Sequence, residues 1–191
     1  MTILTSNTPY FAGHLLVAMP GMPDPRFSKA VIYICSHTKD GAMGLVINQA
    51  MDDISLPELL KQLDISPSEH ANDISVQLGG PVEQGRGFVL HSSDYVHEGT
   101  LVVDNQLALT GTMEILKDIA DGSGPQKSML ILGYAGWGPG QLDAEILDNG
   151  WLTVQADADL VFDHDLDAKW QHALGKLGID LSLLSDVAGH A

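Results

Sequence analysis

The side chains that could support chemistry include a cysteine and a histidine two residues apart. Cys35 and His37 would alternate onto one side of an extended segment, so that thiol and imidazole could be neighbours. A neighbouring imidazole can activate a thiol as a nucleophile or redox group. However, Cys35 ends the apolar run Val31–Cys35, where a lone cysteine usually serves as a small buried hydrophobic residue. We therefore expect Cys35 to be buried and structural.

A second group of polar residues surrounds two short glycine turns. Glu83, Arg86 and His91 flank the segments Gly79–Pro81 and Gly85–Gly87. An acid, a base and an imidazole near glycine turns could line a cleft. Arg86 is one of only nine Lys and Arg residues in the chain, which favours a specific partner for it. An internal salt bridge to a carboxylate is the stronger expectation.

A third group lies in and after the glycine-rich segment Gly133–Gly140, between a predicted strand and a predicted helix, where phosphate-binding loops occur. It lacks the Gly-Lys-Ser/Thr of a P-loop, and the third glycine of a dinucleotide motif is replaced by Gln141. The following helix carries Asp143 and Glu145, which would repel a phosphate. The glycines therefore indicate a sharp chain reversal with Trp137 packed over it.

Metal binding is not favoured by any spacing in the chain. None of the eight histidines falls in a zinc-binding pattern. The segment Asp163–Asp167 imitates the start of an EF-hand loop, but Ala168 and Leu174 replace its required Gly and Glu. We expect an acidic turn there, with Asp165 or Asp167 as the N-cap of the next helix. The sequence predicts no metal and no cofactor.

The charge balance argues against direct binding of nucleic acid. Nine Lys and Arg face 25 Asp and Glu, for a net charge of −16, and no two cations are adjacent. The stretch Asp143–Asp167 has eight acidic residues and no Lys or Arg, so it would repel a phosphate backbone or an anionic membrane. Acidity that keeps the protein soluble is the simplest explanation. A basic partner or a divalent cation is the functional alternative.

The composition predicts one folded domain that covers residues 1–191. Hydrophobic residues make up 45% and charged residues 18%, as in ordinary globular proteins. No apolar run approaches the roughly 18 residues of a membrane span. A single cysteine excludes an intrachain disulfide, and the first cation is Arg26, which does not fit the basic start of a signal peptide. These features predict a cytoplasmic protein without a membrane partner.

The hydrophobic pattern predicts many short strands with a few helices between them. The expected strands are Leu15–Met19, Ala30–Cys35, Gly44–Asn48, Ile74–Leu78, Gly87–His91, Thr100–Val103, Leu107–Leu109, Met129–Tyr134 and Trp151–Gln155. The expected helices start near Ser55, Thr112, Pro139 and Leu166 and end near Leu63, Ala120, Leu147 and Leu177, and a short helical turn is expected in Asp180–Ala191. Met129–Tyr134 is almost wholly apolar, which indicates a central strand. This irregular mixture favours an α+β fold.

Several of these segments together resemble the AlgH/YqgE family of bacterial proteins. The blocks that carry the resemblance are Met19–Phe27, Val31–Cys35, Gly41–Asn48, Gly79–Val82, Arg86–His91, Gly133–Leu142 and Asn149–Trp151. They cover nearly the whole chain in the family's order, although Asp143 stands where the family pattern has Glu. The resemblance implies an α+β fold whose mixed, mostly antiparallel sheet is bent and curls toward a partial barrel, flanked by helices.

The resemblance gives no catalytic residues. Some family members carry the label of transcriptional regulator of alginate production, but the charge of this chain argues against direct DNA binding. We therefore expect a non-enzymatic binding or regulatory module that acts through a protein or a small molecule. The alternative is an enzyme with a cleft around Arg86, His91, Trp137 and Glu145.

The expected partner surface lies where the two glycine-rich segments meet. We expect Gly79–Gly87 and Gly133–Gly140 to be close in space, because each follows a predicted strand and carries side chains that a turn does not need. The candidate contact residues are Glu83, Arg86, His91, Trp137, Gln141 and Glu145.

Overall fold

The structure, a computed structural model, describes residues 10–179. Its strands are β1 (His14–Ala18), β2 (Val31–Thr38), β3 (Gly41–Val46), β4 (Val76–Leu78), β5 (Val82–Ser92), β6 (Thr100–Val102), β7 (Leu107–Thr110), β8 (Ser128–Trp137) and β9 (Trp151–Gln155). Its α-helices are α1 (Leu56–Gln62), α2 (Met113–Asp121), α3 (Gln141–Leu147), α4 (Ala158–Val161) and α5 (Leu166–Lys176), with the 3-10 turns η1 (Pro25–Phe27) and η2 (Glu69–Ala71). The helical turn expected in Asp180–Ala191 lies outside the described residues.

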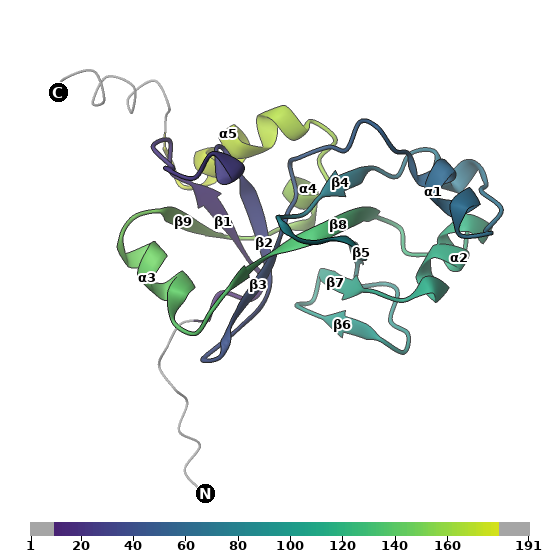
Figure 1. Ribbon diagram of the computed structural model, residues 1–191, viewed down its shortest axis with the longest axis horizontal. Coiled ribbons are helices and arrows are strands. Elements are labelled where there is room, and N and C mark those ends of the chain that lie inside the picture. Colours follow the sequence, from purple (N-terminus) through teal and green to yellow (C-terminus); the bar gives the residue numbers. More distant parts are fainter. Residues whose placement is uncertain (1–9, 180–191) are drawn as a thin grey trace, which may run out of the picture.

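The strands form one curled sheet in the order β6-β7-β5-β8-β3-β2-β1-β9, and β4 pairs with β8 beside that path. All pairings are antiparallel except β4 with β8. Strand β8 pairs with β3, β4 and β5 and runs through the middle of the molecule (Figure 1). The predicted α+β class, the mostly antiparallel bent sheet and the central position of Met129–Tyr134 are confirmed.

Helices cover both faces of the sheet. Helices α4 and α5 pack on one face, where Trp170 and Leu174 join a core with Val31 and Tyr33 of β2. On the other face, α1 and α2 cover β4, β5 and β8, while α3 covers the half made by β1, β2, β3 and β9. Burial on both faces explains why β1 and β2 are continuous apolar runs and do not alternate with polar residues.

The local signals for helix ends were reliable. Ser55 and Glu58 form the reciprocal capping box of α1, and Gly122 ends α2 in the left-handed conformation. Asp165 is the N-cap of α5, where its side chain accepts from the Ala168 N–H at 3.1 Å. The predicted acidic capping turn is therefore confirmed.

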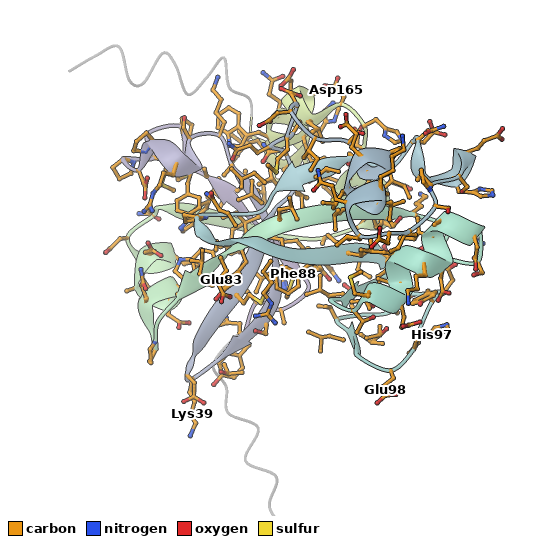
Figure 2. All side chains as sticks on the ribbon, turned by 45° about the vertical axis from the view of Figure 1, so that its right-hand side comes forward. Lys39, Glu83, Phe88, His97, Glu98 and Asp165 are labelled. Carbon is orange, nitrogen blue, oxygen red and sulfur yellow. The ribbon has the colours of Figure 1, made fainter. Side chains whose placement is uncertain are left out.

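Several strands extend further than the apolar runs predicted. β2 and β3 continue to a two-residue hairpin at Lys39 and Asp40, whose tip lies at the bottom of Figure 2. β5 starts at Val82 and β8 continues to Trp137, so both include glycines that we expected in loops. Backbone pairing with a neighbouring strand supports these segments even where side chains contribute little apolar surface. Conversely, α3 begins at Gln141 and not at Pro139.

Three short helical segments were not predicted: η1, η2 and α4, each of three or four residues. Each is too short to show a 3.6-residue hydrophobic period. No helix within residues 10–179 combines the length and the apolar character needed to cross a membrane.

Candidate functional site

The two glycine-rich segments lie side by side, as expected. Val82 of β5 pairs with Tyr134 of β8, and the backbones approach so closely that side chains would not fit between them. A Cβ added at Gly80 would overlap the Tyr134 carbonyl group, and one added at Gly133 would lie 2.7 Å from the Gly80 oxygen. Gly80 and Gly133 also have positive φ angles of +154° and +78°. These two glycines are therefore required by the close approach of the strands.

Glu83 and Arg86 lie on the surface of this junction and pair with each other. Arg86 Nη1 is 3.5 Å from Glu83 Oε2, and the two side chains are 62% and 56% exposed. The guanidinium carbon of Arg86 also lies 5.0 Å from the ring centre of Phe88. Figure 2 shows Glu83 and Phe88 near the middle of the view, on the long β5 strand. The internal salt bridge expected for Arg86 is thus present.

His91 is a buried core histidine. Its side chain is fully buried, and Nδ1 lies 2.8 Å from the Ser92 carbonyl oxygen, which can only accept. Nδ1 therefore carries the proton, and Nε2 accepts from the Thr110 hydroxyl at 2.8 Å. Burial lowers the pKa of His91, opposed by the bond to Ser92. Both ring nitrogens are occupied by neighbours in the protein.

Trp137, at the end of β8, interacts with Glu145 of α3. Trp137 is only 8% exposed and packs edge-on against Trp151, with ring centres 6.4 Å apart. Burial raises the pKa of Glu145, while the Trp137 indole lowers it, and Glu145 Oε2 is buried without a hydrogen-bond partner in the described part of the chain. Gln141 accepts the Gly138 N–H at 3.0 Å and so closes the turn before α3.

The six candidate contact residues are therefore not gathered in one place. His91 is paired with Ser128 at the start of β8, whereas Trp137 is the last residue of that strand, nine positions further on. Arg86, His91, Trp137 and Glu145 do not form the expected cleft. His91 and Trp137 are both buried, at opposite ends of β8. A role in partner contact for the exposed Glu83, Arg86 and Gln141 stays a prediction.

Cys35 and His37 also have separate environments. Cys35 is 3% exposed in the core, and burial raises the pKa of its thiol to about 12. The imidazole of His37 accepts the Phe11 N–H at Nδ1, and its Nε2 faces Asp143 of α3 at 3.4 Å. A register shift between Ile34 and Ser36 interrupts the strand between them. The expected burial of Cys35 is confirmed.

A groove of about 760 Å³ lies elsewhere on the molecule, and sequence reasoning did not find it. Its walls come from three separate segments of the chain: η2 with the residues that lead into and form β4, the end of α2 with the loop to β8 and the start of β8, and α4 with the α4–α5 turn. This size suits a small organic ligand.

Gln77 is the unusual feature of this groove. It lines the groove from β4 and is only 1% exposed. Its Nε2 donates to Ser75 Oγ at 3.0 Å, but its Oε1 is buried and has no hydrogen-bond partner among residues 10–179. An unpaired buried carbonyl-type oxygen costs roughly 1–3 kcal/mol, so such groups call for an explanation.

The rim of the groove is acidic. The carboxylates that line it are Glu69, Asp73, Asp159 and Asp163, and the lining cation is Lys127. Lys127 Nζ lies 3.6 Å from Asp159, which offsets that one carboxylate. The pKa of Asp163 is lowered, first by the Asp165 N–H and then by His172, so this carboxylate stays ionised at neutral pH.

Lys169 binds the last residue of α4, the helix that contributes Asp159 to the groove. It is fully buried, and its Nζ donates to the carbonyl oxygens of Ile47 at 2.9 Å and Val161 at 2.8 Å. Val161 is the last residue of α4, so the lysine joins that helix to the residue that follows β3. Burial lowers the pKa of Lys169 to about 8, with an opposing contribution from Asp163. In the sequence, Lys169 is one charged residue in a predicted helix, and nothing there indicates that it is buried.

The groove does not present a metal site. Within residues 10–179 no group of three or more His, Cys, Asp or Glu side chains is close enough to hold a metal ion. A divalent cation, one of the two functional alternatives for the acidic stretch, therefore has no cluster of ligands there.

Comparison with known proteins places the chain among relatives along its whole length. The chain is 56% identical to a UPF0301 protein of Rhodospirillum rubrum over 190 residues, which cover 100% of this chain and 99% of the relative. It is 54% identical to a UPF0301 protein of a Jannaschia species, with 94% of each chain covered.

Solved structures agree with this relationship. The solution structure of the AlgH protein from Pseudomonas aeruginosa superimposes with a TM-score of 0.78 at 44% identity and covers 100% of both chains. Protein DIP2367 from Corynebacterium diphtheriae has the same fold, with a TM-score of 0.70 at 21% identity over 89% of this chain and 88% of the other. The AlgH-like family model matches residues 15–182, and the chain therefore belongs to the AlgH-like family.

Proposed function

We propose that this protein is a non-enzymatic regulatory module that binds a small molecule in the groove beside β4. The observation that carries the proposal is Gln77, which lines the groove and whose buried Oε1 has no partner among residues 10–179. A ligand that donates to this atom would remove the cost of leaving it unpaired. We further propose that residues 1–191 act as one domain in the cytoplasm, and that regulation does not involve direct DNA contact, because the net charge is −16.

Binding without catalysis fits the side chains of the groove. Its hydroxyl groups are those of Ser75 and Ser128, and Ser75 Oγ accepts from Gln77, with no base within hydrogen-bond distance of it in the described chain. A nucleophile normally needs such a base. Cys35 and His91, the thiol and the imidazole singled out from the sequence, are buried elsewhere. The imidazoles that line the groove are those of His70 and His164.

The test is a fragment screen by NMR with ¹⁵N-labelled protein and fragments of neutral, cationic and anionic character. We expect at least one class to shift the amide signals of Gln77, Ser128 and Asp163 in a saturable way. The amides of Tyr134 and Gly136, in the glycine junction, serve as the internal control and should not shift. A screen in which all three classes leave the groove amides unmoved would overturn the proposal.

A further inference from the structure

Among its lining residues the groove combines Gln77, whose buried Oε1 has no partner in residues 10–179, with several carboxylates. This combination selects among the ligands that a groove of about 760 Å³ could take. The inference rests on the proposed function, because it names the class of molecule that would occupy the same groove.

Gln77 Oε1 would bind a hydrogen-bond donor of the ligand. Gln77 Nε2 is already used by Ser75 Oγ, so the open position at Gln77 is the acceptor Oε1. A carbonyl-type oxygen accepts and cannot donate. A ligand group such as an ammonium or a guanidinium supplies several N–H donors at once, and its hydrogen bonds are stronger than those of neutral donors.

The rim favours a positive charge on that ligand. Among the described residues no lysine or arginine forms a salt bridge with Glu69, Asp73 or Asp163, whereas Asp159 is near Lys127. The charge of Lys169 makes a small contribution to the lowered pKa of Asp163. An anionic ligand would have to enter against this field, and a cation would be attracted by it. The imidazole of His172 lies 3.3 Å from Asp163, and it adds charge there only when protonated.

Three alternatives fit less well. A metal ion lacks a cluster of three ligands in residues 10–179. A phosphate or carboxylate would meet like charges at the rim. A neutral amide could donate to Gln77 but would leave the rim carboxylates without a counter-charge.

We propose that the groove binds a small organic cation, with an ammonium or guanidinium N–H group donating to Gln77 Oε1 and the positive charge held by Asp73 and Asp163. The acidic stretch that the sequence singled out contributes Asp159 and Asp163 to this site. Some of the acidic residues of the chain would thus bind the ligand, in addition to any effect of the net charge on solubility.

The experiment is calorimetric titration of the full chain with putrescine and agmatine at pH 7.5. The matched probes are 1,4-butanediol, which is neutral, and succinate, which is anionic. We expect a saturable site for at least one of the two amines and none for the diol or succinate. Affinity should fall several-fold between low salt and about 0.15 M salt, because the rim interactions are screened.

Two variants and a control locate the binding. Gln77→Leu should weaken amine binding by about tenfold or more, the effect of losing a hydrogen bond to a charged group. Asp73→Asn should weaken it by a few-fold. Asp148→Asn, on the exposed end of α3 and outside the groove, should leave it unchanged. Circular dichroism melting of each variant separates lost binding from lost folding.

The outcomes distinguish this inference from the proposed function. Amine binding that is unaffected by Gln77→Leu in a folded variant would overturn the inference. So would groove shifts in the fragment screen that come from neutral or anionic fragments alone, and in that case the proposed function would stand. Absence of groove shifts with every fragment class, cations included, would overturn both.

Discussion

The glycine junction and the groove differ in what the sequence reveals about them. The junction, where Gly79–Gly87 meets Gly133–Gly140, is marked by glycines and prolines that are visible in the sequence. In the structure its central glycines are explained by backbone contact alone. The groove is assembled from three segments without a common motif, yet it includes Gln77, whose Oε1 has no partner among the described residues. The glycine-rich motif, the clearest in the sequence, therefore reflects a requirement of folding. The feature that favours ligand binding is the buried amide of Gln77.

The largest expected effect is at the junction. Gly80→Ala should destabilise the protein by about 3 kcal/mol or more, because overpacking and an unfavourable φ each cost about 1–3 kcal/mol. Gly85→Ala is the matched control on the same segment, since a Cβ there has nothing within 4 Å. Urea unfolding of both variants measures the difference. Equal stabilities would mean that the junction tolerates side chains and is not held by close backbone contact.

The next effect concerns Lys169, the buried lysine bonded to the end of α4. The folded-state pKa of Lys169 is about 8, below its unfolded value of 10.5, so the unfolded state binds the extra proton in this range. Stability should therefore rise as pH increases from about 8 to 10.5, by about 3 kcal/mol in total and about 1 kcal/mol before pH 9.

Lys169→Met isolates this contribution. The pKa of Cys35 is raised from 9.0 to about 12, so the Cys35 contribution to stability falls above pH 9 and opposes the lysine there. The unfolding free energy of wild type and variant is measured from pH 7 to pH 9. Their difference cancels the pH dependence of the titratable groups that both proteins contain. If the unfolding free energies of wild type and variant change equally with pH over this range, burial does not lower the pKa of Lys169.

A smaller effect of opposite sign is expected at the groove floor. Gln77→Leu removes an unpaired buried oxygen, so it should raise the stability of the ligand-free protein by up to about 1 kcal/mol. Gln126→Leu, at an exposed position of the same groove, is the control and should change stability by less than about 0.5 kcal/mol. A clear loss of stability in Gln77→Leu would indicate that Oε1 of Gln77 has a structural partner.

The smallest effect is expected for the exposed pair at the junction. Arg86→Ala should change the free energy of unfolding by less than about 1 kcal/mol, because exposed ion pairs contribute little. The Glu83→Ala variant and the double variant complete a thermodynamic cycle. A coupling well above 1 kcal/mol would mean that the arginine is more than a surface residue of the folded chain.

Local chemistry made most of the fold predictable. The capping box at Ser55, the stop at Gly122 and the N-cap at Asp165 each depend on hydrogen bonds between residues a few positions apart. Strand ends were less predictable, since the last residues of β2 and β8 are held by pairing with strands distant in sequence. The 3-10 turns and α4 were too short for a periodic signal.

The sites were far less predictable than the fold. His91 and Glu83 looked alike in the sequence as polar residues near glycine turns, but one is fully buried and the other is exposed. Gln77 is a polar residue inside the apolar segment Ile74–Leu78 that we predicted as a strand, and this was the one available signal for the groove. Its meaning depends on a missing partner, which only coordinates reveal.

A crystal structure of the protein saturated with agmatine tests whether Gln77 binds an organic cation in the groove. We expect the amine in the groove, with a nitrogen atom within about 3.2 Å of Gln77 Oε1. We also expect that the backbone of the glycine junction is unchanged. A groove that holds only water under saturating agmatine, or a Gln77 Oε1 bonded to a donor of the protein itself, would contradict this expectation.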